Sequence, residues 1–97
     1  MNKLKFVWDQ EKASLNIRKH SVSFDEARTV FYDENALEFF DPDHSEEEDR
    51  FILLGLSFKM RILVVCHCLR EASSTIRIIS ARKATRHEAQ TYEERET

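Results

Sequence analysis

The chain has 97 residues, of which 41% are hydrophobic and 34% are charged, and its formal net charge is −3. This apolar content is enough to order a single domain over residues 1–97, which excludes a mainly disordered chain, and no apolar run approaches the ~18 residues that a membrane-spanning helix needs. Because residues 1–9 lack the apolar stretch of a signal peptide, we expect a cytoplasmic protein. The two cysteines, Cys66 and Cys68, are too few for a disulfide scaffold.

Charge is distributed unevenly along the chain. Residues 1–49 carry 6 Lys or Arg and 13 Asp or Glu, whereas residues 50–97 carry 9 and 5. Most of the acidic residues lie between residues 33 and 49, and most of the arginines come later. This asymmetry permits a basic face on an acidic protein, although a mixed, solvated surface explains the same composition.

The N-terminal part of the chain predicts one strand and two helices. Residues 3–8 alternate charged and apolar side chains, as a strand does. Asp9 is a suitable N-cap for a helix over residues 10–20. A capping box that begins at Ser23 predicts a second helix over residues 24–31. The second helix is expected to bury Phe24, Ala27, Val30 and Phe31.

From residue 36 onward the apolar residues recur with the two-residue period of strands. The predicted strands cover residues 36–40, 50–56, 61–69 and 75–81, separated by an acidic loop at 44–49 and by short connections at 57–60 and 71–74. A second capping box, at Thr85, begins a last helix that ends near residue 95. The order β-α-α-β-β-β-β-α predicts an α+β fold, in which a small antiparallel sheet is packed by two N-terminal helices and one C-terminal helix.

Two patterns that suggest a metal site lack a complete set of ligands. On a strand, Cys66 and Cys68 face one way and His67 the other, so the three side chains cannot bind one ion. Acidic residues alternate between residues 41 and 49 as in a calcium loop, but Glu46 stands where that loop needs glycine. Glycine motifs that bind phosphates or dinucleotides are also absent from the sequence. We therefore expect neither a metal nor a cofactor.

Basic and polar side chains share one face of the first predicted helix. Helical spacing places Lys12, Asn16, Lys19 and His20 together, beside an apolar stripe of Ala13 and Ile17. Cations at a helix C-terminus complement the helix dipole, which gives Lys19 and His20 a purely structural role. The functional alternative is RNA cleavage without a metal. In that reaction histidine moves protons at the ribose 2′-hydroxyl and the leaving 5′-oxygen, and arginines bind the phosphate.

Three ordered blocks of the sequence resemble a known family. They are Trp8-Asp9-x-x-Lys12-x-x-x-Asn16-x-x-Lys19-His20-x-Val22-x-Phe24-x-x-Ala27, then Asp49-Arg50-Phe51-Ile52-x-x-Gly55, then Arg77-Ile78-Ile79-Ser80-Ala81-Arg82-x-Ala84-x-x-x-Glu88. Together they resemble the BrnT-type toxins of bacterial type II toxin–antitoxin systems. The resemblance extends over residues 5–92.

The resemblance implies a fold like that of the RelE-type toxins and an endoribonuclease that arrests bacterial growth. It also implies a BrnA-type antitoxin that blocks the toxin, forms a 2:2 complex with it and brings the pair to operator DNA through a ribbon-helix-helix region. The implied partners are the antitoxin and the RNA substrate, and the toxin contacts operator DNA only through the antitoxin.

The resemblance places the candidate catalytic residues at Lys19, His20, Arg50 and Arg82. We expect Arg82 and Arg50 to bind phosphate and stabilise transition-state charge, His20 to act as acid or base, and Lys19 to position phosphate. Arg61 and Arg77 are second candidates. If the last strand is straight, Arg77 and Arg82 point to opposite faces and cannot both line one site.

Two of these arginines have alternative partners. Arg50 follows Asp49, and the alternative is that it only pairs with the acidic loop. The alternative for Arg82 is that it binds the antitoxin instead of RNA. For catalysis, the acidic loop has to lie away from the site. Exposed Phe58 and Met60 in the connection at 57–60 would suit a partner surface.

Two other functions compete with the ribonuclease. One is a catalytically inactive member of the family that acts only as an antitoxin-binding co-repressor. The other is an unrelated RNA-binding protein, which is disfavoured because no obvious strand face presents stacking aromatic residues.

Overall fold

The computed structural model describes residues 4–46, 48–70 and 74–95. Its elements are β1 (Lys5–Val7), α1 (Gln10–His20), α2 (Phe24–Thr29), the 3-10 helix η1 (Val30–Tyr32), β2 (Leu37–Phe40), the 3-10 helix η2 (Pro42–His44), β3 (Arg50–Leu56), β4 (Ile62–Arg70), β5 (Thr75–Lys83) and α3 (Arg86–Glu93). The predicted order of strands and α-helices is confirmed. Residue 3 of the first predicted strand, residue 47 of the acidic loop and residues 71–73 of the last connection lie outside the described residues.

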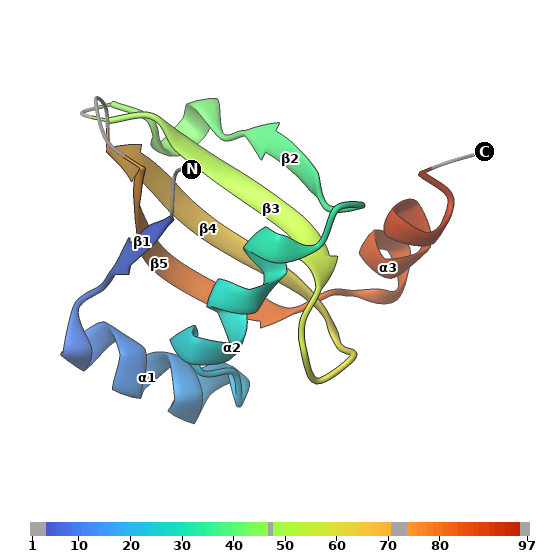
Figure 1. Ribbon diagram of the computed structural model, residues 1–97, viewed down its shortest axis with the longest axis horizontal. Coiled ribbons are helices and arrows are strands. Elements are labelled where there is room, and N and C mark those ends of the chain that lie inside the picture. Colours follow the sequence, from blue (N-terminus) through green and yellow to red (C-terminus); the bar gives the residue numbers. More distant parts are fainter. Residues whose placement is uncertain (1–3, 47, 71–73, 96–97) are drawn as a thin grey trace.

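The strands form one five-stranded sheet in the order β1-β5-β4-β3-β2. Strands β2 to β5 pair antiparallel, as predicted. Strand β1 pairs in parallel with β5, with Val7 opposite Arg77, so the prediction of a purely antiparallel sheet was wrong. The reason is that the chain runs from β1 directly into α1, which packs beside β5. This connection brings β1 to the free edge of β5 running in the same direction (Figure 1).

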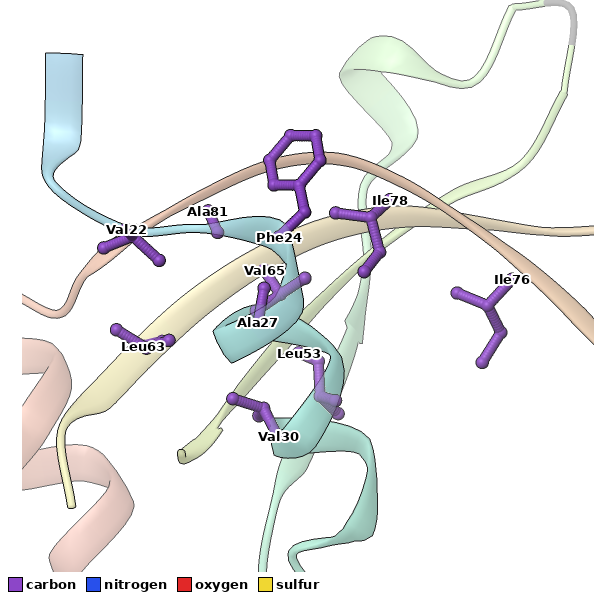
Figure 2. Close-up of a cluster of buried hydrophobic side chains, with 10 residues drawn as sticks. All are labelled: Val22, Phe24, Ala27, Val30, Leu53, Leu63, Val65, Ile76, Ile78 and Ala81. Carbon is purple, nitrogen blue, oxygen red and sulfur yellow. The ribbon is translucent and has the colours of Figure 1, made fainter. Parts of the chain in front are cut away.

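The two faces of the sheet bury different side chains. Facing residues of antiparallel strands lie on the same side of a sheet, so the register assigns each residue to a face. On one face, which we call the helix-packed face, the core comprises Val22, Phe24, Ala27, Val30, Leu53, Leu63, Val65, Ile76, Ile78 and Ala81 (Figure 2). On the opposite face a smaller cluster joins Leu54 and Val64 to Tyr92 of α3. The N-terminal and C-terminal helices therefore cover opposite faces.

Local capping signals set the helix boundaries. Helix α1 has the predicted bounds, and Asp9 accepts a hydrogen bond from the backbone N of Lys12 at 3.0 Å. Thr85 and Glu88 form both halves of the capping box that begins α3. Helix α2 is shorter than predicted because the chain tightens into the 3-10 turn η1 at Val30. Within the described residues, no helix has the length and apolar content needed to cross a membrane.

The capping box predicted at the start of α2 is only half formed. Ser23 accepts from the backbone N of Glu26 at 3.0 Å, but the carboxylate of Glu26 is 1% exposed and turns toward the β3–β4 turn. There it accepts from Arg61 Nε at 2.9 Å and from the Ser57 hydroxyl at 2.6 Å. The hydrogen bond from Arg61 lowers the pKa of Glu26, although burial opposes it. This buried pair joins α2 to the turn.

Gly55 permits a close approach between β3 and the segment that follows α2. A Cβ at this position would lie 2.8 Å from both Val30 Cγ1 and the Cβ of Ala36, and 3.1 Å from Asp33 Oδ2. Atoms of side chains do not approach so closely without displacement. The glycine is therefore a packing requirement of the helix-packed face.

Candidate functional site

The face opposite α1 and α2 carries arginines from two strands. In the register of β4 with its neighbours, Cys68 lies opposite both Arg50 and Arg77, and Val64 lies opposite Arg82. Because Cys68 and Val64 are four residues apart in one strand, their side chains share a face. We call this surface, with Arg50, Arg77 and Arg82, the arginine face.

A bulge in β5 places Arg77 and Arg82 on the same face. The register pairs Cys66 with Ser80 but His67 with Ile78, so that Ile79 is the extra residue of β5. Arg77 and Arg82 are five residues apart, so in a straight strand they would lie on opposite faces, as predicted from the sequence. The bulge shifts the alternation of side chains by one residue, so Arg77 and Arg82 lie on the same face of the sheet.

Arg82 is held by a carboxylate at one edge of its guanidinium group. Its Nη1 and Nη2 donate to the two carboxylate oxygens of Glu88 at 2.8 and 2.9 Å. The hydrogen bond from Arg82 is the main cause that lowers the pKa of Glu88 from 4.5 to about 2. No described residue accepts a hydrogen bond from Arg82 Nε. Nη1 also donates to the carbonyl of Lys83 at 3.3 Å. The Nε–Nη2 edge of a guanidinium fits two phosphate oxygens, and here Nη2 also donates to Glu88.

The acidic loop approaches the arginine face. Glu48 forms an ion pair with Arg77, whose Nη2 also lies 3.8 Å from Cys68 Sγ. Burial raises the pKa of the Cys68 thiol, and Glu48 raises it further. Glu48 therefore neutralises Arg77, which lies four residues of strand β4 away from the row of Arg82.

Arg50 begins β3 at the same end of the sheet as Arg77. Its backbone N donates to Ser45 Oγ at 2.9 Å, and no described carboxylate lies within ion-pair distance of its side chain. The acidic loop therefore forms an ion pair with Arg77 rather than with Arg50. Four residues of strand separate the rows of Arg50 and Arg82, which is about 13 Å along the sheet.

Lys19 and His20 occupy the exposed C-terminal turn of α1. One turn earlier, Asn16 anchors the helix to the edge of β5, where it accepts from the backbone N of Ala81 at 3.1 Å and donates to its carbonyl at 2.8 Å. Ala81 directly precedes Arg82, so the end of α1 adjoins the end of β5 that carries Arg82. The side chain of Arg82 points to the sheet face opposite the one that buries Ala81, and Arg50 lies at the other end of the sheet.

The helical face shared by Lys12, Asn16, Lys19 and His20 is not a uniform surface. Only Asn16 of this group is buried. The apolar stripe predicted beside it is also divided, because Ala13 packs against the core whereas Ile17 is exposed. Arg61, a second candidate, serves the buried carboxylate of Glu26 rather than the arginine face.

His67 points into the opposite side of the sheet from the cysteines, as its position in a strand predicts. Its ring lies 4.8 Å from the ring of Phe31 and 5.9 Å from that of Phe51. Burial lowers the pKa of His67. Among the described residues, no group of three or more His, Cys, Asp or Glu side chains is arranged to hold a metal ion.

The roles of Glu88 and Phe39 on the arginine face could not be predicted from local sequence. The capping box explains why Glu88 lies in the first turn of α3, but its hydrogen bonds with Arg82 depend on the tertiary structure. The two-residue period predicts Phe39 only as part of a strand. It pairs with Ile52 on the arginine face and is 46% exposed.

The fold and this surface define a class of protein: a small α+β domain whose helices leave arginines on one sheet face. The sequence model of the family described as "Ribonuclease toxin, BrnT, of type II toxin-antitoxin system" matches residues 8–88, and the chain belongs to this family. The assignment agrees with the resemblance found in the three sequence blocks.

A solved structure supports the same fold. The chain is similar to the 1.1 Å crystal structure of the Brucella abortus ribonuclease toxin BrnT, with a TM-score of 0.65 and 23% sequence identity. The similarity covers 87% of this chain and 100% of that one. A comparison with curated proteins gives no match.

Proposed function

We propose that this chain is a metal-independent endoribonuclease, the toxin of a type II pair, with a RelE-like fold. Family membership supports the toxin and ribonuclease roles. The observation that carries the proposal is the guanidinium of Arg82, which Glu88 holds by one edge so that the other edge is aligned for a phosphate. Glu88 offsets the charge of Arg82 but fixes its orientation, and pre-oriented N–H donors stabilise the charge of a phosphorane without reorganisation during the reaction.

The proposed reaction divides its tasks between the end of α1 and β5. Arg82 binds the scissile phosphate, and Lys19 adds a second positive charge from the helix end. His20 moves a proton, because an imidazole is suited to serve as acid or base near neutral pH. The ribose 2′-hydroxyl gives up its proton to a base as its oxygen attacks phosphorus, and the 5′-oxygen leaves with a proton from an acid; His20 acts in one of these two transfers. The products are a 2′,3′-cyclic phosphate and a 5′-hydroxyl.

Arg50 has a different part in this proposal. Its row lies about 13 Å along the sheet from that of Arg82, and β4 separates the two strands. We assign Arg50 to a neighbouring phosphate of the same RNA strand. Loss of Arg50 is then expected to weaken RNA binding more than the rate of cleavage of bound RNA.

Cleavage of RNA by the purified chain tests the activity. We expect end-labelled RNA to give 2′,3′-cyclic phosphate ends in buffer containing EDTA. Arg82→Ala and His20→Ala are expected to lower the single-turnover rate by about 10²-fold or more, in the range typical of electrostatic and acid–base groups. Arg18→Ala, which removes an exposed cation from the last turn of α1, is the matched control. Intact RNA with folded parent protein would exclude the enzyme and leave the co-repressor role.

We further propose that a BrnA-type antitoxin, in a 2:2 complex, covers the β3–β4 turn. Phe58 and Met60 are 64% and 75% exposed there. Phe58 also borders a pocket of about 420 Å³ lined by Thr29, Tyr32, Asp33, Leu56 and Ser57. Exposed apolar side chains at one pocket are typical of a surface that another protein buries.

Growth of bacteria expressing the chain tests this second part of the proposal. The parent is expected to arrest growth when expressed alone and to be harmless when the antitoxin is co-expressed. Phe58→Ser should still arrest growth alone, because it is outside the proposed catalytic group, but should escape neutralisation. If the antitoxin protects against Phe58→Ser as well as against the parent, the β3–β4 turn is not the antitoxin surface.

A further inference from the structure

We propose that Phe39 is a base-stacking residue of the arginine face, where it binds an unpaired nucleobase of the RNA whose phosphates the arginines hold. This inference rests on the proposed ribonuclease function and adds to it a single-stranded substrate and a subsite. None of the residues considered for catalysis is a phenylalanine, tyrosine or tryptophan.

The first support is the position of Phe39 in the sheet. It lies opposite Ile52 in the β2–β3 register, and Arg50 is two residues before Ile52 in β3. Phe39 and Arg50 are therefore diagonal neighbours on one face, about 7–8 Å apart, which is within reach of aromatic and long side chains. This spacing suits a base and a phosphate of the same nucleotide.

The second support is that Phe39 has open surroundings. Strand β2 is the edge of the sheet, with β3 as its one neighbour in the order of strands. The smaller cluster under α3 takes in Leu37, Ile52 and Leu56 of this region, but not Phe39. A ring in contact with solvent at a sheet edge leaves its π face available to a base.

The third support is the chemistry of the same face. The row beside Phe39 contains Arg50, Cys68 and Arg77 in neighbouring strands; Arg77 is paired with Glu48, whereas no described carboxylate lies within ion-pair distance of Arg50. Cations next to an exposed aromatic ring are the combination that single-stranded nucleic acids bind, because phosphates pair with the cations and bases stack on the ring. A protein partner would favour an interface centre poorer in charge.

Phe40 provides a matched control from the same strand. It is 51% exposed, but its position opposite Phe51 puts it on the helix-packed face, where the two rings lie 5.6 Å apart. Phe39 and Phe40 are thus adjacent phenylalanines of similar exposure that differ in the face they occupy. Only Phe39 is expected to affect RNA.

Fluorescence anisotropy with an uncleavable RNA measures this binding. The probe is a labelled eight-nucleotide 2′-O-methyl RNA of mixed sequence, which lacks the attacking hydroxyl. We expect Phe39→Ala to weaken binding by about 5- to 150-fold, the effect of losing one stacked base. Phe39→Tyr should bind like the parent, and Phe40→Ala within twofold of it. A probe with abasic sites should bind the parent and Phe39→Ala equally. Circular dichroism confirms that each variant is folded.

Each failure has a distinct signature. If Phe39→Ala binds like the parent while Arg50→Ala binds weakly, the face binds RNA without stacking, and the proposal for Phe39 is wrong. If the parent binds neither probe, both the stacking subsite and the proposed ribonuclease fail. If Phe39→Ala retains its RNA affinity but no longer captures the antitoxin, the face belongs to a protein partner and the inference is overturned.

Discussion

Replacement of Asn16 by alanine tests the link between α1 and the sheet. The side chain is 6% exposed and makes three hydrogen bonds, to the carbonyls of Val22 and Ala81 at 2.9 and 2.8 Å and from the backbone N of Ala81 at 3.1 Å. Each bond contributes about 0.5–1.5 kcal/mol net, and the partners left behind are buried. We therefore expect Asn16→Ala to lower the free energy of unfolding by about 3 kcal/mol.

The assay is urea unfolding followed by the fluorescence of Trp8, the one tryptophan of the sequence, whose ring lies 5.8 Å from that of Phe24. A loss of this size also lowers Tm by about 12–24 °C in a domain of fewer than 100 residues. Ser14→Ala, an exposed change in the same helix, is expected to stay within about 0.5 kcal/mol of the parent. A loss below 1 kcal/mol for Asn16→Ala would refute the reasoning, because the edge of β5 would then not need this side chain.

Three more changes test other parts of the structure. Gly55→Ala should lower stability by about 1–3 kcal/mol, since its Cβ meets atoms at 2.8 Å, and unchanged urea unfolding would contradict the packing argument. Glu88→Gln should be less stable than the parent at neutral pH. The low pKa of Glu88 stabilises the fold above pH 4.5 and this contribution is lost as the pH falls toward about 2, so urea midpoints should converge over that range; a constant gap would exclude a role for its charge. Glu48→Gln frees Arg77 and should tighten binding of the 2′-O-methyl RNA by about 1.5- to 5-fold at low salt, and weaker binding would show that Glu48 assists RNA.

Elements with a strong local signal were predicted with their bounds. Helix α1 and strand β3 agree residue for residue, because a cap at Asp9 and a compact apolar run in β3 do not depend on distant contacts. Strand β5 is two residues longer than predicted. The two extra residues are in the strand because they pair with β4, where Lys83 lies opposite Leu63.

The parallel position of β1 and the bulge at Ile79 had no signal in the sequence. Both depend on which strand becomes the neighbour and at what register, and alternation within one strand does not contain that information. The candidate site was limited in the same way. The resemblance supplied positions such as Arg82, whereas the partner carboxylate of Glu88 and the open ring of Phe39 follow from packing.

The bulge at Ile79 makes the arrangement of the site depend on the number of residues in β5 as well as on their identity. Deletion of this one residue would leave every arginine in the sequence but restore strict alternation. Either Arg77 or Arg82 would then turn into the apolar layer beneath α2, where a charged group is costly. Relatives that align without gaps over this strand can therefore share the site even where its apolar residues differ. A one-residue gap there signals a different surface even when both arginines are retained.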